Sequence, residues 1–448
     1  MRRERHERAS QLVRDLVAGG GCSACSLLRR PRRRHVPLAL SASVPVVTPS
    51  SPLPAELGRT LLVTVTGPDR PGVTARLFES LSGVDVEVVD VEQVVVRGHL
   101  TLVVLLSSGP DEGRVMAAVN GLGRELGLRV TCQSGTGDNY PRPRGRLAVT
   151  LLGAPLRPVA VAAVADLIAS HGANIDRVRR LSRYPVTTLE LDVSGTDAPG
   201  LRRLLVAEAS RRGIDVAVSP GGLARRGRRL VVMDVDSTLI ADEVIDLLAD
   251  KAGRRDEVAA VTARAMRGEL DFAESLHERV ACLAGMEETV LADVRDAVRL
   301  TPGARTLCRT LRRLGFTLGL VSGGFTEIVE PLAEQLDVRY LRANRLETVD
   351  GRLTGRVTGP VVDRAGKADA LREFAAAEGL PLARTVAIGD GANDVDMLAA
   401  AGLGIAFNAK PIVRQQADAA VNVPYLDAVL YLLGISREEV EEADEAAP

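Results

Sequence analysis

Two carboxylates, Asp234 and Asp236, come directly after a run of apolar residues that has the composition of a buried strand. The stretch from Val231 to Ile240 reads VVMDVDSTLI. A buried carboxylate is costly unless a cation or hydrogen-bond donors compensate its charge. The two acids therefore either mark an ordinary, solvated strand end or share a chemical task. In extended backbone, side chains two residues apart point to the same side. This pair could therefore reach opposite ends of one reacting group.

Three other short stretches carry residues that suit the binding of phosphate and metal. Ser322 precedes two glycines in LVSGGF, and Asp390, Asn393 and Asp394 lie in AIGDGANDVDML, each after an apolar run. Glycine-rich turns let backbone N–H groups approach phosphate, and Lys367 in DRAGKADAL adds a positive charge. Mg²⁺ prefers one or two protein carboxylates together with phosphate oxygens. The combined set of groups indicates phosphate chemistry assisted by Mg²⁺.

The elements expected around these residues follow the order of a doubly wound parallel sheet. A first strand after residue 228 leads into a mainly helical block at about 241–300, and strands then alternate with helices. In such sheets the functional groups collect at the carboxyl ends of the strands, where the aspartates and the serine are found. We expect an α/β domain at 228–437 with the helical block inserted as a cap, and an acidic tail at 438–448.

The preceding part of the chain shows the order β-α-β-β-α-β twice. This order is that of an α+β ferredoxin-like fold, and its repetition predicts two such domains in tandem. We expect the first domain at 58–138 and the second at 144–220. The stretch GGLARRGRR at 221–229 then reads as a linker.

Length and composition limit the classes of protein. A chain of 448 residues is too long for one core, so about two to four domains are expected. The formal net charge of −1 provides no general attraction to nucleic acid or to anionic membranes. No apolar run approaches the roughly 18 residues that a membrane span needs. The five scattered cysteines indicate no disulfide framework and favour a reducing, cytoplasmic location.

Residues 1–57 differ in composition from the rest of the chain. Ten arginines fall within residues 1–34, and Val36–Pro54 is rich in proline, serine and valine. Because no apolar segment follows the basic start, a secretory signal is not expected. We interpret the stretch as disordered, or as the product of a start codon placed too early. Cys22 and Cys25 have no second cysteine pair, so we interpret them as incidental and not as a metal or redox site.

The four stretches together resemble the signature of the haloacid dehalogenase-like phosphatases. This signature reads, in order, DVDST, SGG, a lone lysine and GDGANDVDM, and the likeness covers about 229–435. Glu243 and the cap stretch AMRGELDFAESLHERV resemble the phosphoserine phosphatase branch of the family. The stretch Val65–Phe78, VTGPDRPGVTARLF, is very similar to the opening of an ACT domain, an amino-acid-sensing module. The fold implied is a Rossmann-like core with a helical cap, preceded by two ACT domains.

The resemblance implies the roles of the acidic residues. Asp234 would be the nucleophile that forms an aspartyl-phosphate, and Asp236 would protonate the leaving oxygen and then deprotonate the attacking water. Mg²⁺ would be held by Asp234, Asp390 and the backbone carbonyl of Asp236. Asp394 would support this metal shell from behind.

The resemblance also implies a pocket for a zwitterionic phosphate ester. The expected contacts are Ser322, Gly323, Lys367 and Asn393 at the phosphoryl oxygens, Glu243 at the ammonium, Arg279 at the carboxylate, and Met266 and Phe272 as an apolar wall. The implied reaction is hydrolysis of O-phospho-L-serine to L-serine and phosphate, the last step of L-serine synthesis.

The two N-terminal domains imply regulation by an amino acid such as L-serine. The first carries Asp69 and Gly72 in a turn before a helix, where a ligand carboxylate could bind. The second has Val159 in place of Gly72, but it has Asn174 where the first has an aspartate. Each domain therefore holds part of a candidate effector site. We expect that site to be shared across the interface of a homodimer or a higher homo-oligomer, and a purely structural role is the alternative.

Two other functions stay open from the sequence. One is a phosphatase of the same fold with another small phosphate ester as substrate, against which Glu243 and Arg279 argue because together they match a zwitterion. The other is an amino-acid sensor with an inactive hydrolase half. The intact set of Asp234, Asp236, Lys367 and Asp390 argues against it. A transporting ATPase is excluded by the absence of membrane-spanning runs.

Overall fold

The computed structural model describes residues 58–107, 109–137, 146–196, 198–221, 227 and 230–446. Its contacts divide the chain into two compact units, Met1–Asp138 and Asn139–Pro448. The expected N-terminal extension with Cys22 and Cys25, most of the expected linker and the end of the tail lie outside the described residues.

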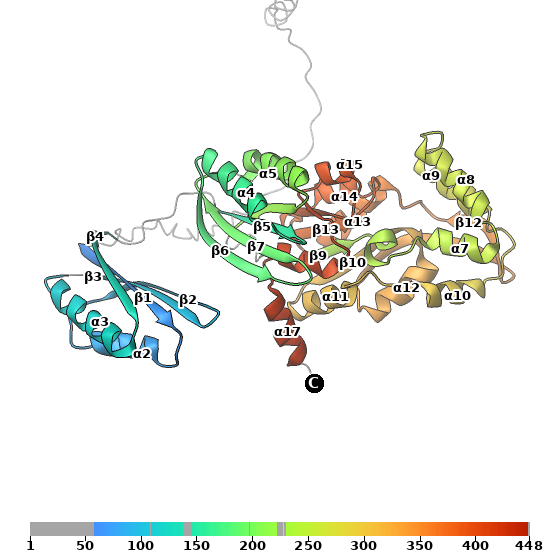
Figure 1. Cartoon of the computed structure of the whole chain (residues 1–448). Coiled ribbons are helices and arrows are strands. Elements are labelled where there is room, and N and C mark those ends of the chain that lie inside the picture. Colours follow the sequence, from blue (N-terminus) through green and yellow to red (C-terminus); the bar gives the residue numbers. More distant parts are fainter. Residues whose placement is uncertain are drawn as a thin grey trace, which may run out of the picture. The chain divides into compact units, whose positions relative to one another are not determined.

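The first unit confirms the expected order β-α-β-β-α-β. Its elements are β1 (Arg59–Pro68), α2 (Val73–Leu81), β2 (Val88–Val96), β3 (His99–Ser107), α3 (Glu112–Leu126) and β4 (Arg129–Thr136). The four strands form an antiparallel sheet in the order β2-β3-β1-β4. Alternate residues of β1 and β3 are buried, because one face of the sheet packs on α2 and α3 to form the core of this unit (Figure 1).

The second unit begins with another copy of the same fold. Its elements are β5 (Arg146–Gly153), α4 (Pro158–Ser170), β6 (Asn174–Ser182), β7 (Thr187–Ser194), α5 (Ala198–Arg212) and β8 (Asp215–Pro220). Helices α4 and α5 cover one face of the strands (Figure 1). Part of the other face is buried: Leu152, Leu181 and Val186 belong to the same buried core as the α/β domain that follows.

The rest of the second unit is an α/β domain with a helical insertion after its first strand. The elements of the insertion and its approach are β9 (Leu230–Met233), the tight turn η1 (Val235–Leu239), α7 (Val244–Ala252), α8 (Arg255–Met266), α9 (Phe272–Ala281) and α10 (Val290–Ala297). The remaining elements are α11 (Ala304–Arg313), β10 (Thr317–Phe325), α12 (Thr326–Gln335), β11 (Tyr340–Val349), β12 (Arg352–Thr358), α13 (Arg364–Ala377), η2 (Leu382–Arg384), β13 (Thr385–Gly389), α14 (Val395–Ala400), β14 (Leu403–Phe407), α15 (Pro411–Gln416), β15 (Ala419–Val421), η3 (Leu426–Ala428), α16 (Val429–Leu432) and α17 (Arg437–Glu445).

The core sheet has the order β12-β11-β10-β9-β13-β14-β15, and the strands from β11 to β15 run parallel. Val231 and Met233 of β9 point into a core with α11 and α12, whereas Leu230 and Val232 point toward α13 and α14. Helices therefore cover both faces, which explains why β9 and β13 are buried along their full length. This arrangement confirms the expected doubly wound sheet (Figure 1).

The second ferredoxin-like domain continues the sheet of the α/β domain. Strand β15 pairs with β8 at Ala419 and Ala217, which gives one sheet of 11 strands. Asp215 accepts hydrogen bonds from the backbone N–H of Asn422, at 2.6 Å, and from its side-chain amide. Arg202 forms an ion pair with Asp418 across the same junction. The pairing of β15 with β8 makes this domain an integral part of the second unit. The sequence did not predict this pairing.

The cap is attached to the core by two neighbouring segments. Ile240 bridges Leu300 in antiparallel fashion, and the N–H of Ala241 donates to the carbonyl of Arg299 at 2.9 Å. Within the cap, α9 begins at a capping box in which Asp271 and Glu274 bind each other's backbone N–H groups at 2.8 and 2.9 Å. Such a box fixes the start of the helix that carries Arg279.

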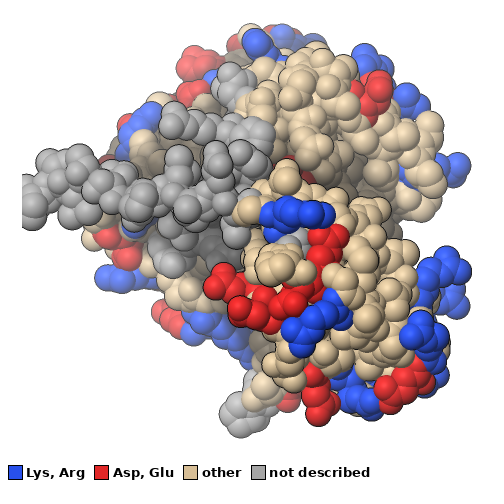
Figure 2. All heavy atoms as spheres, turned by 90° about the vertical axis from the view of Figure 1, so that its left-hand side faces the viewer, with Lys and Arg blue, Asp and Glu red and all other residues tan. Residues whose placement is uncertain are grey.

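Among the described residues, no helix combines the length and the apolar character that crossing a bilayer requires. On the face shown in Figure 2, basic and acidic side chains lie in small neighbouring groups, in keeping with the formal net charge of −1.

Candidate active site

Three parallel strands bring the predicted acids to one edge of the sheet. Met233 at the end of β9 is in register with Leu320 of β10 and with Ile388 of β13. Asp234 follows β9 directly, and its N–H donates to the carbonyl of Ile388 at 2.9 Å. The side chains that follow these strands therefore converge, as expected from the topology.

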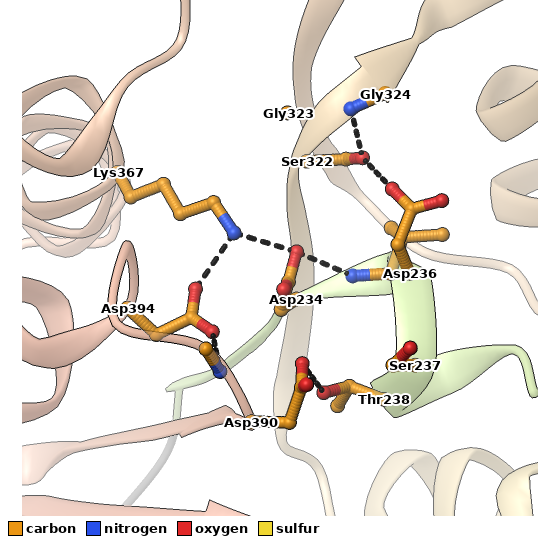
Figure 3. Close-up of polar contacts among 12 residues, drawn as sticks. Asp234, Asp236, Ser237, Thr238, Ser322, Gly323, Gly324, Lys367, Asp390 and Asp394 are labelled. Carbon is orange, nitrogen blue, oxygen red and sulfur yellow. Dashed lines mark hydrogen bonds and ion pairs between the residues drawn. The ribbon is translucent and has the colours of Figure 1, made fainter. Parts of the chain in front are cut away.

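Lys367 forms the buried centre of the site (Figure 3). Its Nζ lies 2.7 Å from Oδ1 of Asp234 and 2.6 Å from Oδ1 of Asp394. Burial alone would lower the pKa of Lys367, but the two carboxylates outweigh it and raise that pKa. For Asp234, burial and the nearby Asp394 raise the pKa, and Lys367 opposes them. Lys367 thus keeps its positive charge beside two buried carboxylates.

Asp236 is held in a different environment by the turn η1. Its Oδ1 accepts from the N–H of Val244 at 2.8 Å, and its Oδ2 accepts from Oγ of Ser322 at 2.9 Å. Burial raises the pKa of Asp236, and these two donors oppose the shift. The turn is tight because Ser237 adopts a left-handed backbone conformation with φ of 55°. A carboxyl with a raised pKa suits proton donation.

A third carboxylate completes a cluster that could hold a metal ion. One oxygen each from Asp234, Asp390 and Asp394 lie within 4.8 Å of one another. Burial and the charge of Asp394 raise the pKa of Asp390 to about 6. Hard oxygen donors at this spacing fit a divalent cation such as Mg²⁺. Asp394 also accepts from the N–H of Gly391 at 2.9 Å, so both of its oxygens already have partners.

A cavity of about 450 Å³ lies between the core and the cap. The predicted residues that line it are Asp234, Asp236, Gly323, Lys367, Asp390 and Asn393 from the core, and Glu243, Met266, Phe272 and Arg279 from the cap. Ser322 and Asp394 lie behind its wall, fully buried. The structure therefore brings together the whole set of residues predicted in the catalytic half of the sequence.

The cap side of the cavity carries one carboxyl group, that of Glu243, and one guanidinium group, that of Arg279. Glu243 accepts a hydrogen bond from Oγ of Ser237 at 2.7 Å. Burial, together with the charge of Asp236, raises the pKa of Glu243 to about 7. Burial also lowers the pKa of Arg279, and nearby Glu243 opposes that shift. Two opposite charges on one wall suit a ligand with a charge of each sign.

Phe272 brings the cap against the glycine loop. A Cβ atom added to Gly323 would lie 3.0 Å from Cζ of Phe272, so this position has room only for glycine unless the ring moves. Met266, the other residue predicted for the apolar wall, is 71% exposed.

Sequence reasoning missed the roles of the two residues after the aspartate pair. Ser237 holds Glu243, and Oγ1 of Thr238 donates to Asp390 at 3.3 Å. Their signal was present, because small hydroxyl residues directly after a strand-end acid pair are well placed to orient neighbouring carboxylates. Asn344, discussed below, was also missed.

The residues of the candidate effector site lie in both units. In the first unit, Gly72 caps the N-terminus of α2 with φ of 92°, and the N–H of Asp69 donates to the carbonyl of Gly98 at 2.7 Å. In the second unit, Nδ2 of Asn174 donates to Asp176 at 2.8 Å. The buried positions of α4 match those of α2 when Val159 is aligned with Gly72.

Comparisons with known proteins give the class to which this architecture belongs. Residues 231–399 match the family of haloacid dehalogenase-like hydrolases, and residues 59–133 and 147–219 each match an ACT domain. Fold and site together define a haloacid dehalogenase-like hydrolase with two ACT domains before it.

Full-length relatives narrow the class. The chain is 60% identical over 390 residues to a phosphoserine phosphatase of Streptomyces coelicolor. The aligned region covers 87% of this chain and 95% of the relative. It is 52% identical over 404 residues to phosphoserine phosphatase SerB2 of Mycobacterium tuberculosis. This match covers 88% of this chain and 97% of the relative. A solved structure of a probable phosphoserine phosphatase from Vibrio cholerae has a TM-score of 0.52 at 33% identity, over 69% of this chain and 91% of the other. The chain belongs to the phosphoserine phosphatase family.

Proposed function

We propose that the protein hydrolyses O-phospho-L-serine to L-serine and phosphate through an aspartyl-phosphate, as the last step of L-serine synthesis. The observation that carries this proposal is one cavity in which the buried Asp234 and Lys367 face Glu243 and Arg279 of the cap. The first pair suits transfer of a phosphoryl group. The second pair suits an amino acid, whose carboxylate and ammonium need opposite charges.

In the first step, a carboxylate oxygen of Asp234 forms a bond to phosphorus while the bond from phosphorus to the serine oxygen breaks. Asp236 gives its proton to that oxygen, which leaves as the hydroxyl of L-serine. In the second step, a water attacks phosphorus, Asp236 takes a proton from it, and Asp234 is released with inorganic phosphate. Ser322 donates to Asp236 and holds it in position throughout.

The carboxylates Asp234 and Asp390, with the backbone carbonyl of Asp236, would hold Mg²⁺, and Asp394 would support them from behind. When bound, Mg²⁺ supplies positive charge that lets an anionic nucleophile and an anionic phosphate approach each other. One oxygen each from the carboxylates Asp234, Asp390 and Asp394 lie within 4.8 Å of one another, and hard oxygen donors fit this ion. Lys367 and the N–H of Gly323, with Asn393 nearby, would bind the other phosphoryl oxygens. Ser322 was predicted for the same role, but its hydroxyl donates to Asp236 at 2.9 Å and accepts from the N–H of Gly324.

Substrate choice rests on Arg279 and Glu243 in this proposal. Arg279 would bind the serine carboxylate through two parallel hydrogen bonds, and Glu243 the ammonium. The test is a comparison of O-phospho-L-serine with p-nitrophenyl phosphate, which lacks both groups, for wild type and Arg279→Ala. We expect the variant to lose phosphoserine turnover far more than nitrophenyl turnover. Equal losses for both substrates would favour a phosphatase of another specificity.

We further propose that the ACT domains bind an amino acid such as L-serine, at a site that includes Asp69, Gly72 and Asn174 and is formed in a homodimer or a higher homo-oligomer. The match of both domains to the ACT family and the left-handed Gly72 at a helix start support this proposal. Titration of the full-length protein with L-serine, with Gly72→Val as the variant, tests whether the effector binds there.

A further inference from the structure

Asn344 on β11 binds two segments of the active site with one amide group. Its Nδ2 donates to the carbonyl of Gly323 at 2.8 Å, and its Oδ1 accepts from the N–H of Val362 at 2.8 Å. The side chain is only 2% exposed. Gly323 lies in the glycine loop that lines the cavity, and Val362 lies two residues before the start of α13, the helix that carries Lys367. The amide therefore connects the two segments that would bind the phosphoryl group.

The sheet itself explains why the glycine loop needs such a partner. Strands β10 and β11 are in register at Val321 and Arg342, and again at Phe325 and Asn344. Three residues of β10, from 322 to 324, thus face the single residue 343 of β11, and the loop bulges out of the ladder. Backbone groups that leave a ladder inside a protein must find other partners. The Asn344 side chain supplies one of them.

The contact reaches the proposed acid through a row of hydrogen bonds. The carbonyl of Gly323 and the N–H of Gly324 belong to one planar peptide and point in opposite directions. Asn344 binds the carbonyl end, and the N–H end donates to Oγ of Ser322 at 2.7 Å. The same Oγ donates to Oδ2 of Asp236 at 2.9 Å, as Figure 3 shows. The orientation of this one peptide thus fixes the hydroxyl that holds Asp236.

The loop also packs closely against its neighbours. A Cβ atom on Gly324 would lie 2.9 Å from Oδ2 of Asp236, and one on Gly323 would lie 3.0 Å from Phe272 of the cap. Neither position therefore has room for a side chain, and the loop lies close to both Asp236 and the cap.

We propose that Asn344 is a positioning residue of the phosphoryl site, which fixes the Gly323–Gly324 peptide and, through Ser322, the carboxylate of Asp236. This inference rests on the proposed function. The chemistry at Asn344 requires an amide, because the carbonyl of Gly323 needs a donor and the N–H of Val362 needs an acceptor. An aspartate would offer two acceptors and a leucine neither group, although both have nearly the same size.

The experiment measures steady-state hydrolysis of O-phospho-L-serine and product inhibition for Asn344→Asp and Asn344→Ser, with Mg²⁺ present. The matched control is Thr385→Val on β13, a fully buried residue whose Oγ1 donates to the carbonyl of Leu382 at 2.8 Å outside the cavity. For Asn344→Asp we expect kcat to fall by about 10- to 100-fold, because a small misplacement of reacting groups has effects of that order. We expect weaker inhibition by inorganic phosphate, but nearly unchanged inhibition by L-serine.

Two results would overturn this inference. One is an Asn344→Asp variant with wild-type kcat and unchanged inhibition by phosphate. The other is an Asn344→Asp variant that loses inhibition by phosphate and by L-serine to the same extent, with Thr385→Val showing the same losses when it is equally destabilised to heat. Such a match would indicate general destabilisation and not a role in positioning. If wild type does not hydrolyse phosphoserine, the proposed function fails, and binding of inorganic phosphate measured by calorimetry still tests Asn344 separately.

Discussion

Lys367 and Asp234 form an ion pair at 2.7 Å in the interior of the catalytic domain, and both side chains are almost fully withdrawn from solvent. The same lysine binds Asp394 at 2.6 Å, so two carboxylates and one ammonium group share a site where their side chains are buried. Such an arrangement is stable only while all partners are present, or while another cation replaces the missing charge.

Replacing the lysine should therefore affect stability and activity together. Lys367→Met leaves two buried carboxylates without their cation and should lower the free energy of unfolding by roughly 3–5 kcal/mol in metal-free buffer. Adding Asp394→Asn to it should recover part of the stability, because one of the two uncompensated charges is removed. Urea denaturation measures this. Activity should stay absent in both variants, and recovery of turnover in the double variant would contradict a direct role of Lys367 at phosphate.

Removal of the metal should destabilise the folded protein. A ligand that binds only the folded state stabilises it, by about 2.7 kcal/mol at a concentration of 100 times its dissociation constant. We therefore expect Mg²⁺ to raise the melting temperature of wild type. Asp390→Asn should abolish most of this rise, whereas Asp396→Asn, in the exposed ion pair with Arg364, should keep it. An equal rise in all three proteins would place the metal elsewhere.

The pH dependence of substrate binding should follow Glu243. Its pKa is raised to about 7 in the free enzyme, chiefly by burial. Below that pH the carboxyl is neutral and cannot pair with the substrate ammonium, so KM should rise as pH falls through about 7, and recover above it. Glu243→Gln should have a high KM at every pH and should lose this inflection. An unchanged inflection in the variant would assign it to another group, such as Asp390, whose pKa is raised to about 6.

The junction between the second ACT domain and the catalytic sheet should contribute to stability. Asn422→Ala removes the side-chain donor from Asp215 and should cost roughly 1–3 kcal/mol in unfolding free energy at neutral pH. Burial already raises the pKa of Asp215. Loss of the donor raises it further, so the cost should shrink in acid, where the carboxyl is neutral. Denaturation of the full chain at two pH values checks the sign, and an equal cost at both would contradict it.

Much of the catalytic half could be predicted because its chemistry is tied to strand ends. The carboxyl ends of neighbouring parallel strands meet at one edge, so Asp234, Ser322 and Asp390 could be placed together from their positions in the sequence. The cap residues were harder to place from pattern alone, and the resemblance to a family supplied Glu243 and Arg279.

The parts that could not be predicted depend on contacts without a local signal. Strand β15 has three residues and meets β8 through one pair, Ala419 and Ala217, which no periodicity reveals. The nearly continuous apolar run LAVTLLG of β5 was the hint in the sequence, because a strand of a sheet with one open face would alternate. The structure buries this run from Leu147 to Gly153. Asn344 is one of several polar residues in RYLRANRLE, and nothing in this stretch sets it apart. The positioning role proposed for it depends on the bulge of β10 opposite it.

The central claim is that Asp234 attacks the phosphorus of O-phospho-L-serine. The most direct measurement is phosphate release from this substrate by wild type and Asp234→Asn, each with Mg²⁺ and with a chelator. The account predicts rapid, metal-dependent release by wild type and none above background by the variant, although the variant stays folded. Release by Asp234→Asn at a rate close to that of wild type would contradict it.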